Sequence, residues 1–399
     1  MIRTYKYRLY PRNAQKRTLD FLLWQGRKLY NAALEQRINA YQETGKAVSY
    51  VEQWAHFRDE RHANPDTLGQ LNATCVQQML RRLDKAFKAF FRRVKAGETP
   101  GFPRFKGRYR FHSLEFRHGD GCKLRFDDQG RALFYVQNAG EIKVKYHRPL
   151  PDDATIKHVV VKRKDNKWYV CLQVDLNRSD ELPNPESVAV GGPAVGIDMG
   201  LESLLALSDG TLIENPRWLR RSQRKLRVAQ RRLSRRQKGS KRRRKAAGQV
   251  ARLHERISNQ RRDFWHKLTR NLVDTYGLIG LEDLTLDFMT RNHHLALSAH
   301  DAGLGEFQQL LRYKAEEAGI EVVTVNPRNT SQTCSGCGVI VKKGLSVRVH
   351  CCPHCGLELN RDVNAARNVL TLALNAARTE RSEPNVDQRV ERALRSRRL

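Results

Sequence analysis

The chain has 399 residues, 40% of them apolar, which is enough for more than one domain with a packed core. Its 74 Lys and Arg residues against 42 Asp and Glu residues give a formal net charge of +32. Such a charge repels itself unless a polyanion is bound, so we expect nucleic acid as the partner. An anionic membrane is the alternative, but the sequence has no run of the ~18 apolar residues that a span requires. The N-terminus also lacks the apolar core of a signal peptide, so we expect a soluble intracellular protein.

The first hundred residues are expected to be mainly helical. Residues 1–10 alternate like a strand that ends at Pro11, and helical spacing follows from Asn13 to Gly45. A second helix is predicted over 68–95, and we assign its aromatic residues, Phe87, Phe90 and Phe91, to a bundle core.

Residues 100–111 alternate basic and aromatic side chains between glycine and proline. This pattern is typical of phosphate contact combined with base stacking. We therefore predict nucleic-acid contacts there; an irregular loop with a solvated charged face is the alternative. The predicted contacts are Arg104, Phe105, Lys106 and Arg108.

Short strand-like runs separated by turn residues come next. Their spacing predicts a small barrel or sandwich. A segment rich in Pro, Asn, Ser and Gly, 178–193, then reads as a linker. Cys75, Cys122 and Cys171 lie in apolar contexts and are predicted to be small core residues. The predicted strands are 113–117, 122–126, 132–136, 141–146, 156–163 and 167–175.

After the linker, Asp209-Gly210 predicts a hairpin of two antiparallel strands. In the first strand Gly196, Asp198 and Gly200 share one face. Glycine and aspartate are poor strand residues, and we interpret the missing side chains as room for a hydrated metal ion and a phosphodiester beside Asp198. An Asp satisfied by nearby backbone donors is the alternative.

Two further carboxylates follow other apolar segments. The strand 278–284 carries Glu282 at its carboxyl end, where open sheets place their sites, while Asp283 is expected to face the loop. Asp362 stands at the start of a helix, where an N-cap is its simplest role. The predicted element order is that of an RNase H-like domain, which could bring all three carboxylates together. Such a set favours two Mg²⁺ ions for phosphodiester hydrolysis.

Two Cys-x-x-Cys pairs, each followed by glycine, predict a metal module. Paired knuckles of this kind present four thiolates to one tetrahedral Zn²⁺, and four cysteines leave no open position for catalysis. The zinc is therefore expected to be structural. The predicted ligands are Cys334, Cys337, Cys352 and Cys355.

No acid occurs from residue 216 to residue 254, while Lys and Arg are dense and apolar residues recur at helical spacing. We predict two long helices with one buried stripe, forming one wall of a nucleic-acid channel; a solvated face is the alternative. The predicted contacts are Arg231, Arg232, Arg235 and Arg236. His293 and His294, further on, are assigned to a surface loop.

Taken together, the motifs resemble the TnpB (OrfB) family of transposon-encoded RNA-guided endonucleases, which are related to compact type V CRISPR effectors. The resemblance covers nearly the whole chain. It implies that Asp198, Glu282 and Asp362 are catalytic and that the four paired cysteines hold zinc. The motifs that carry it are 101–107, 196–200, 208–210, 291–296, 330–338 and 361–366.

The resemblance also implies a multidomain α+β and α/β organisation. A wedge-like β-barrel (1–10 and 100–178) would receive an inserted helical recognition lobe (11–99). After a linker (179–193), an RNase H-like RuvC nuclease domain (194–326 and 359–374) would be interrupted by a zinc insert (327–358), and a disordered tail (375–399) would follow.

The implied partners are a guide RNA, target double-stranded DNA and the RNA–DNA heteroduplex, in a prokaryotic cytoplasm at the nucleoid. The protein would cut DNA after guide pairing beside a short DNA motif that it reads itself. A nuclease-inactive RNA-guided repressor and a miniature type V CRISPR effector remain as alternatives, and so does a basic scaffold that packages RNA.

Overall fold

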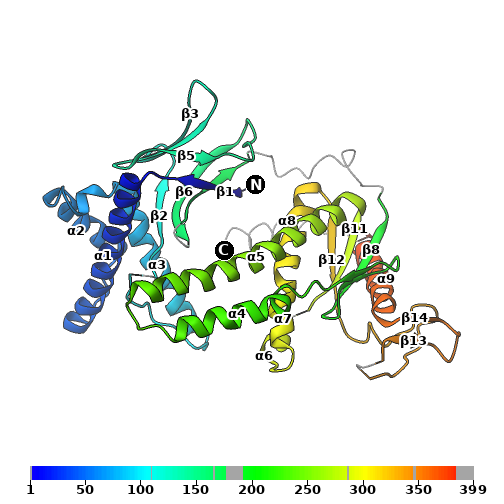
Figure 1. Cartoon of the computed structure of the whole chain (residues 1–399). Helices are drawn as coiled ribbons and strands as arrows, with labels where there is room; N and C mark the ends of the chain where they lie inside the picture. The colour runs from blue at the N-terminus through cyan, green and yellow to red at the C-terminus, as the bar shows by residue number, and fades with distance from the viewer. Residues whose placement is uncertain are drawn as a thin grey trace. The chain divides into compact units, whose positions relative to one another are not determined.

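A computed structural model describes residues 2–108, 110–164, 167–176, 192–284, 287–344 and 347–382. The chain forms two compact units, which divide between Asp180 and Glu181 (Figure 1). This boundary falls within the segment predicted as a linker, most of which lies outside the described residues. Among the described residues, no helix has the length and apolar character needed to cross a bilayer.

The first unit contains one antiparallel sheet in the order β2-β6-β7-β1-β5-β4-β3. Apolar and polar residues alternate along these strands, which places the apolar side chains on one face. In the first strand Tyr5, Tyr7 and Leu9 are buried on that face. All six strands predicted after residue 112 are present. The observed pairings leave β2 and β3 as the end strands, so closure into a barrel stays a prediction. The strands are β1 (Ile2–Tyr10), β2 (Ser113–Arg117), β3 (Cys122–Phe126), β4 (Ala132–Val136), β5 (Gly140–Lys145), β6 (Thr155–Lys164) and β7 (Lys167–Asp175).

The helices of this unit share one hydrophobic core with the sheet. They are α1 (Asn13–Thr44), α2 (Tyr50–Ala63), the short η1 (Leu68–Gln70) and α3 (Ala73–Lys95). The absent side chain of Gly26 lets α1 approach the sheet, because a Cβ there would lie 3.1 Å from the Leu114 side chain. Cys75, Cys122 and Cys171 are buried, as predicted.

The assignment of the α3 aromatic residues to a bundle core is wrong in part. The buried positions of α3 end at Leu83. Phe87 packs against the core from a partly buried position, whereas Phe91 is 58% exposed. Phe87 and Phe90 instead make edge-to-face contacts with Phe102. The apolar spacing continues to the end of the helix, but the last turns extend past the core.

The second unit is built on a five-stranded sheet in the order β10-β9-β8-β11-β12. The first three strands form an antiparallel meander, and β11 and β12 run parallel to β8. The predicted hairpin, the two long helices, the strand that carries Glu282 and the helix that begins near Asp362 are all present. The elements are β8 (Ala194–Met199), β9 (Ser203–Leu207), β10 (Leu212–Glu214), α4 (Trp218–Ser234), α5 (Lys241–Thr275), β11 (Leu278–Glu282), α6 (Asp287–Arg291), α7 (Ala296–Ala302), α8 (Leu304–Ala318), β12 (Glu321–Val325), β13 (Val349–Cys351), β14 (Glu358–Asn360) and α9 (Arg361–Ser382).

Helices cover both faces of this sheet (Figure 1). On one face Trp265 of α5 and Phe307 of α8 share a core with Ile197 of β8. On the other face Val369 and Ala373 of α9 pack against Leu278 of β11 and Val325 of β12. Asp198 alternates with Ile197 along β8 and therefore lies on the α9 face.

Glycine allows α9 to lie directly on the sheet. Gly196 and Gly280 are cross-strand partners on β8 and β11. A Cβ at Gly196 would lie 2.1 Å from the Ala366 carbonyl oxygen, and one at Gly280 would lie 2.8 Å from the Ala373 side chain. Our interpretation of Gly196 as room for a metal ion is therefore wrong, because the backbone of α9 fills that space.

The predicted start of the disordered tail also needs correction. Helix α9 runs to Ser382, and Ala377 is buried in its contact with the sheet. Residues 375–382 therefore belong to the helix. The rest of the predicted tail, 383–399, lies outside the described residues.

Candidate active site and four-cysteine cluster

Asp198 and Glu282 lie on neighbouring parallel strands. The register pairs Ile197 of β8 with Leu281 of β11. Continued by one residue, it sets Glu282 beside Asp198 on the same face of the sheet. Asp198 is partly exposed, whereas Glu282 is buried. Asp283 is exposed, as predicted, and its backbone N–H donates to the Val325 carbonyl.

The third carboxylate comes from the first turn of α9. The N-cap of this helix is Asn360, whose side-chain oxygen accepts from the backbone N–H groups of Asp362 at 2.8 Å and Val363 at 3.3 Å. The simplest role predicted for Asp362, that of an N-cap, is therefore filled by another residue. The Asp362 side chain is left partly exposed at the helix start.

The electrostatics of Asp198 show that the three carboxylates are brought together. Burial raises the pKa of Asp198 most, and the negative charges of Glu282 and Asp362 raise it further, to about 8. The Arg361 guanidinium and the Met199 backbone N–H oppose this shift. A carboxyl that is protonated near neutral pH in the metal-free protein marks a site with negative charge in excess, and a cation would relieve it.

Glu282 is held by a residue that the sequence analysis did not single out as a site residue. The Thr330 side-chain oxygen lies 2.6 Å from Glu282 Oε1. Burial raises the pKa of Glu282, and the Thr330 hydroxyl opposes that rise by donating to the carboxylate. Thr330 lies in the segment between β12 and the first cysteine pair.

Arg361 is a second residue near the carboxylates that was not predicted as a site residue, and its side chain is buried. Its guanidinium donates to the carbonyl of Gly344 at 2.9 Å and to the Ser331 hydroxyl at 3.3 Å. The position of Arg361 next to Asp362 was the one signal in the sequence for its role. No periodicity or spacing distinguished it from the many exposed arginines.

The four paired cysteines form one cluster, with ligand atoms within 4.8 Å of one another. The two knuckles have the same geometry. Gly338 N–H donates to the Cys334 carbonyl, and Gly356 N–H donates to the Cys352 carbonyl, each at 2.9 Å. Both glycines have positive φ, 78° and 72°, as the tight turn requires. Backbone N–H groups of Cys355 and His354 lower the pKa of Cys352, whereas contacts with the neighbouring thiols raise the pKa of Cys337 and of Cys355.

This cluster is the one group of three or more His, Cys, Asp or Glu residues found so close together in the described parts of the chain. The three carboxylates are therefore spaced more widely than the thiolates. Their donor set is nevertheless the hard oxygen set that Mg²⁺ prefers.

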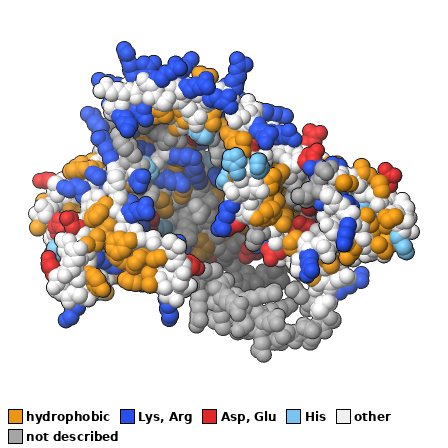
Figure 2. Space-filling model, turned by 90° about the horizontal axis from the view of Figure 1, so that it is seen from below, with side chains coloured by type: hydrophobic (Ala, Val, Ile, Leu, Met, Phe, Trp, Pro, Cys, Tyr) orange, Lys and Arg blue, Asp and Glu red, His pale blue; other side chains and the backbone are white. Residues whose placement is uncertain are grey.

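The predicted arginines of the basic helices are exposed. Arg231 and Arg232 lie in the last turn of α4, and Arg235 and Arg236 lie in the connection to α5. The connection between α4 and α5 is itself stabilised by a basic residue. Arg243 Nη1 donates to the carbonyls of Leu233 and Arg236, each at 2.9 Å. Figure 2 shows Lys and Arg side chains gathered densely along one border of the face in view.

The predicted contacts of residues 104–108 are mostly exposed as well. Arg104, Phe105 and Arg108 are exposed, whereas Lys106 lies with its ammonium over the Tyr30 ring of α1. The Lys106 backbone is fixed by the Asn31 side chain through two hydrogen bonds. Lys106 therefore has a structural role, and its contact with nucleic acid stays a prediction. His293 and His294 are exposed in a turn, as predicted.

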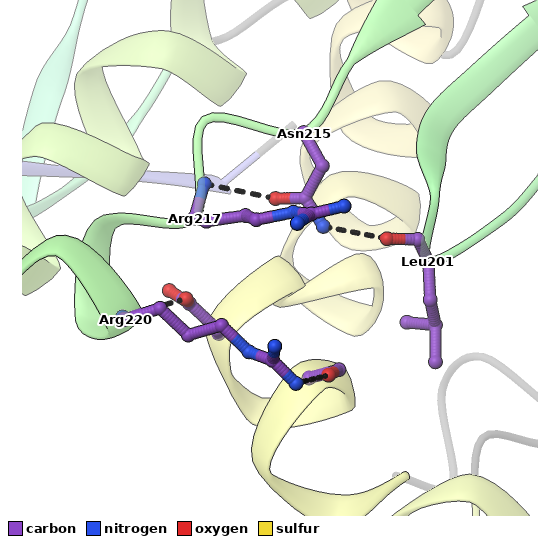
Figure 3. A pocket seen from close by; sticks show the side chains of 6 residues that line it. Leu201, Asn215, Arg217 and Arg220 are labelled. Carbon is purple, nitrogen blue, oxygen red and sulfur yellow. Dashed lines mark hydrogen bonds between the residues drawn. The ribbon is translucent and has the colours of Figure 1, made fainter.

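A small recess of about 80 Å³ lies where α4 begins (Figure 3). Asn215 joins its two sides by donating to the Leu201 carbonyl and accepting from the Arg217 backbone N–H. The buried carboxylate of Asp301 accepts from the backbone N–H groups of Leu219 and Arg220. Because Asp301 caps α4 in this way, we assign it to the fold rather than to chemistry. None of the three candidate catalytic carboxylates lines the recess.

These features define the class of protein: a multidomain α+β architecture with a helical N-terminal part, a carboxylate site and a four-cysteine cluster. Three family models match the chain. They are described as "Probable transposase" of the OrfB_IS605 type (residues 172–293), "Cas12f1-like, TNB domain" (residues 305–369) and "Helix-turn-helix domain" (residues 1–46). In this chain the last match covers a strand and one continuous helix.

Similar proteins agree over nearly the full length. A protein of Streptomyces pristinaespiralis named as an RNA-guided DNA endonuclease is 35% identical, over 94% of this chain and 90% of that protein. InsQ of Escherichia coli K12, named in the same way, is 31% identical over 92% of both chains. Cas12f1 of Sulfoacidibacillus thermotolerans is 24% identical over 75% of this chain and 77% of its own. The chain belongs to the TnpB (OrfB) family of RNA-guided DNA endonucleases.

Solved structures show the same fold at low sequence identity. A Cas12f1 complex with guide RNA and target DNA matches 89% of this chain and 82% of its own, with a TM-score of 0.55 and 17% identity. The mini-RNA-guided endonuclease Cas_phi3 matches 94% of this chain and 92% of its own, with a TM-score of 0.57 and 8% identity. The architecture is therefore Cas12f-like.

Proposed function

We propose that this protein is an RNA-guided endonuclease that hydrolyses DNA phosphodiester bonds with divalent metal ions held by Asp198, Glu282 and Asp362. The observation that supports this most is the convergence of the three carboxylates. The β8–β11 register sets Glu282 beside Asp198, and burial and then the charges of Glu282 and Asp362 raise the pKa of Asp198. The order of the second sheet, with an antiparallel meander joined to parallel strands, supports an RNase H-like (RuvC) domain.

The residues around the carboxylates fit metal-dependent chemistry. Two bound Mg²⁺ ions would activate the attacking water and stabilise the leaving oxygen. Asp198, Glu282 and Asp362 would hold the ions. The Arg361 guanidinium partly offsets the repulsion between the three carboxylates, because it lowers the pKa of Asp198. The thiolates of Cys334, Cys337, Cys352 and Cys355 would hold one structural Zn²⁺.

Guide RNA and target DNA are proposed as partners because the relatives are named as RNA-guided and the basic surfaces fit a polyanion. Base pairing with the guide would select the sequence, and the protein would contact the phosphate backbones of the heteroduplex. The proposed contacts are Arg104, Phe105, Lys106 and Arg108, together with Arg231 and Arg232 at the end of α4 and Arg235 and Arg236 just after it.

The proposal is tested by sequencing the RNA that co-purifies with the protein and then offering DNA complementary to its variable end. We expect cleavage with Mg²⁺, none with EDTA, and none with Asp198→Ala although that variant still binds RNA and DNA. Cleavage by Asp198→Ala at the normal rate would exclude this site. Bound but uncut DNA with the unmodified protein would favour a nuclease-inactive repressor.

A further inference from the structure

The segment between β12 and the first cysteine pair contacts one of the candidate catalytic carboxylates, Glu282. The Thr330 side-chain oxygen lies 2.6 Å from Glu282 Oε1 and 3.0 Å from the Pro327 carbonyl oxygen. A hydroxyl has one hydrogen, and a bond to a carboxylate is the stronger of the two. We therefore assign the hydrogen to Glu282. Both side chains are buried, which keeps water from replacing this bond.

The same segment is fixed from its other side by α9. The Asn368 amide donates to the carbonyls of Thr330 at 2.8 Å and Thr333 at 2.7 Å. The Asn364 amide, which is fully buried, donates to the Thr333 carbonyl and accepts from the Ser335 backbone N–H. Asn364 and Asn368 stand four residues apart and so share one face of the helix.

The cysteine cluster begins within this hydrogen-bonded segment. Cys334 stands between Thr333 and Ser335, both of which are bonded to Asn364. Closing the four-cysteine cluster therefore restrains residues 330–335, and their position on α9 sets the position of the Thr330 hydroxyl. A continuous path of short contacts joins the thiolates to the carboxylate of Glu282.

From this path we propose that Thr330 is a positioning residue for Glu282, and that the four-cysteine module is a structural part of the catalytic centre. The inference rests on the proposed role of Glu282 as a ligand of divalent ions. With Oε1 occupied by the Thr330 hydroxyl, rotation of the Glu282 carboxylate is restricted and Oε2 is free for an ion. Removing such an outer partner weakens metal binding by about 10–100-fold in known metal sites.

The test compares Thr330→Val, which removes the hydroxyl at nearly constant shape, with Thr330→Ser, which keeps it. Thr371→Val makes the same change on the exposed face of α9 and serves as the matched control. Mn²⁺ binding is measured by electron paramagnetic resonance on the RNA-bound protein without DNA, and cleavage rates are measured across a Mg²⁺ series. Zinc content and melting temperature are recorded for every variant.

We expect Thr330→Val to weaken Mn²⁺ binding about tenfold and to move the Mg²⁺ dependence of cleavage to higher concentration, with zinc content unchanged. Thr330→Ser should restore most of the affinity, and Thr371→Val should not alter it. Asn368→Ala, which removes the two bonds that Asn368 makes to the segment, should also weaken Mn²⁺ binding.

Unchanged Mn²⁺ affinity in a folded, zinc-containing Thr330→Val protein would overturn the inference. Equal losses in Thr330→Val and Thr330→Ser would also overturn it, because the hydroxyl would then not be the cause. A separate variant, Glu282→Gln, distinguishes the two levels of the argument. If it bound Mn²⁺ and cut DNA normally, the proposed function of Glu282 would itself be wrong, whatever Thr330 does.

Discussion

Asp198 lowers the stability of the metal-free protein above acidic pH, because its partly exposed but largely desolvated carboxylate ionises beside two others. Its pKa in the folded protein, about 8, lies far above its ordinary value. The stability that this group contributes is therefore complete below the unfolded-state pKa of about 4 and is lost as the pH rises through 8. Functional sites often carry such a cost, which a bound ligand then relieves.

Replacing Asp198 with Asn should therefore stabilise the metal-free protein at high pH. We expect a gain of about 1–3 kcal/mol at pH 8.5 and a smaller gain at pH 5, because the neutral amide removes the repulsion. Thermal melts in EDTA at both values of pH measure it. Asp283→Asn, at an exposed neighbouring position, should have no such effect. A gain that did not grow with pH would contradict the electrostatic account.

The cap of α9 gives a second prediction at this scale. Asn360→Ala should destabilise the protein by about 1 kcal/mol, because two N–H groups of the first helical turn lose their acceptor. Asp362→Asn should not destabilise the metal-free protein, since Asp362 is not the cap. Chemical denaturation in EDTA measures both variants. The reverse order of effects would restore Asp362 to a capping role.

Single residues were predictable from sequence where their chemistry is unusual. A carboxylate in an apolar strand and paired cysteines before glycine are unusual patterns, and they led to the predictions for Asp198, Glu282 and the four cysteines. Asp362, at a helix start, was predicted to be catalytic through the family resemblance. Thr330, Asn364 and Asn368 were missed as individual site residues because Thr and Asn are common on surfaces. The available signal was their helical spacing: Arg361, Asn364 and Asn368 put polar groups on one face of α9, where an apolar stripe would be expected.

At the scale of elements, the contact between α9 and β8 decides where the carboxylates meet. Gly196→Ala should be severely destabilising, by about 3 kcal/mol or more, because its Cβ would overlap the Ala366 carbonyl of α9. Gly248→Ala in α5 is the matched control. Its Cβ meets nothing nearer than the Arg252 guanidinium at 3.9 Å, so we expect a gain of about 0.5–1 kcal/mol.

Melting temperatures of the two glycine variants make the comparison. Gly196→Ala should also lose divalent-ion binding if any of it folds, since α9 carries Asp362. If both variants melted like the unmodified protein, the close packing of α9 on β8 would be wrong.

The strands and helices themselves were largely predictable, whereas their surroundings were not. Period-two alternation and Asp-Gly turns located the strands, because those patterns act locally. What packs on Gly196 is the backbone of Ala366 and Leu370 on a helix far along the chain, and no local pattern carries that information. For the same reason the apolar spacing of α3 could not show that its last turns leave the core.

At the scale of the whole molecule, the net charge of +32 predicts a steep salt dependence of nucleic-acid binding. Replacing Arg231, Arg232, Arg235 and Arg236 together with Gln should reduce the log–log slope by about 3, since each phosphate contact contributes about 0.7–0.9. Arg270→Gln should leave the slope unchanged, because that guanidinium is already paired with Asp274. Filter binding across a salt series measures the slopes.

A slope that stayed the same in the fourfold variant would remove these arginines from the nucleic-acid surface. A nearly flat slope in the unmodified protein would contradict the polyanion argument as a whole. The charge pattern was readable from sequence because it needs no fold, but which arginines are structural was not. Arg243 and Arg361 are used by the fold, whereas Arg242 and Arg244, on either side of Arg243, are exposed.

The central claim is that Asp198, Glu282 and Asp362 form one divalent-ion site beside the four-cysteine cluster. The most direct test is anomalous diffraction from crystals of the RNA- and DNA-bound protein grown with Mn²⁺. The account predicts Mn²⁺ peaks within ligand distance of all three carboxylates and a separate zinc peak at the four thiolates. Zinc at the cysteines with no Mn²⁺ at the carboxylates would contradict it.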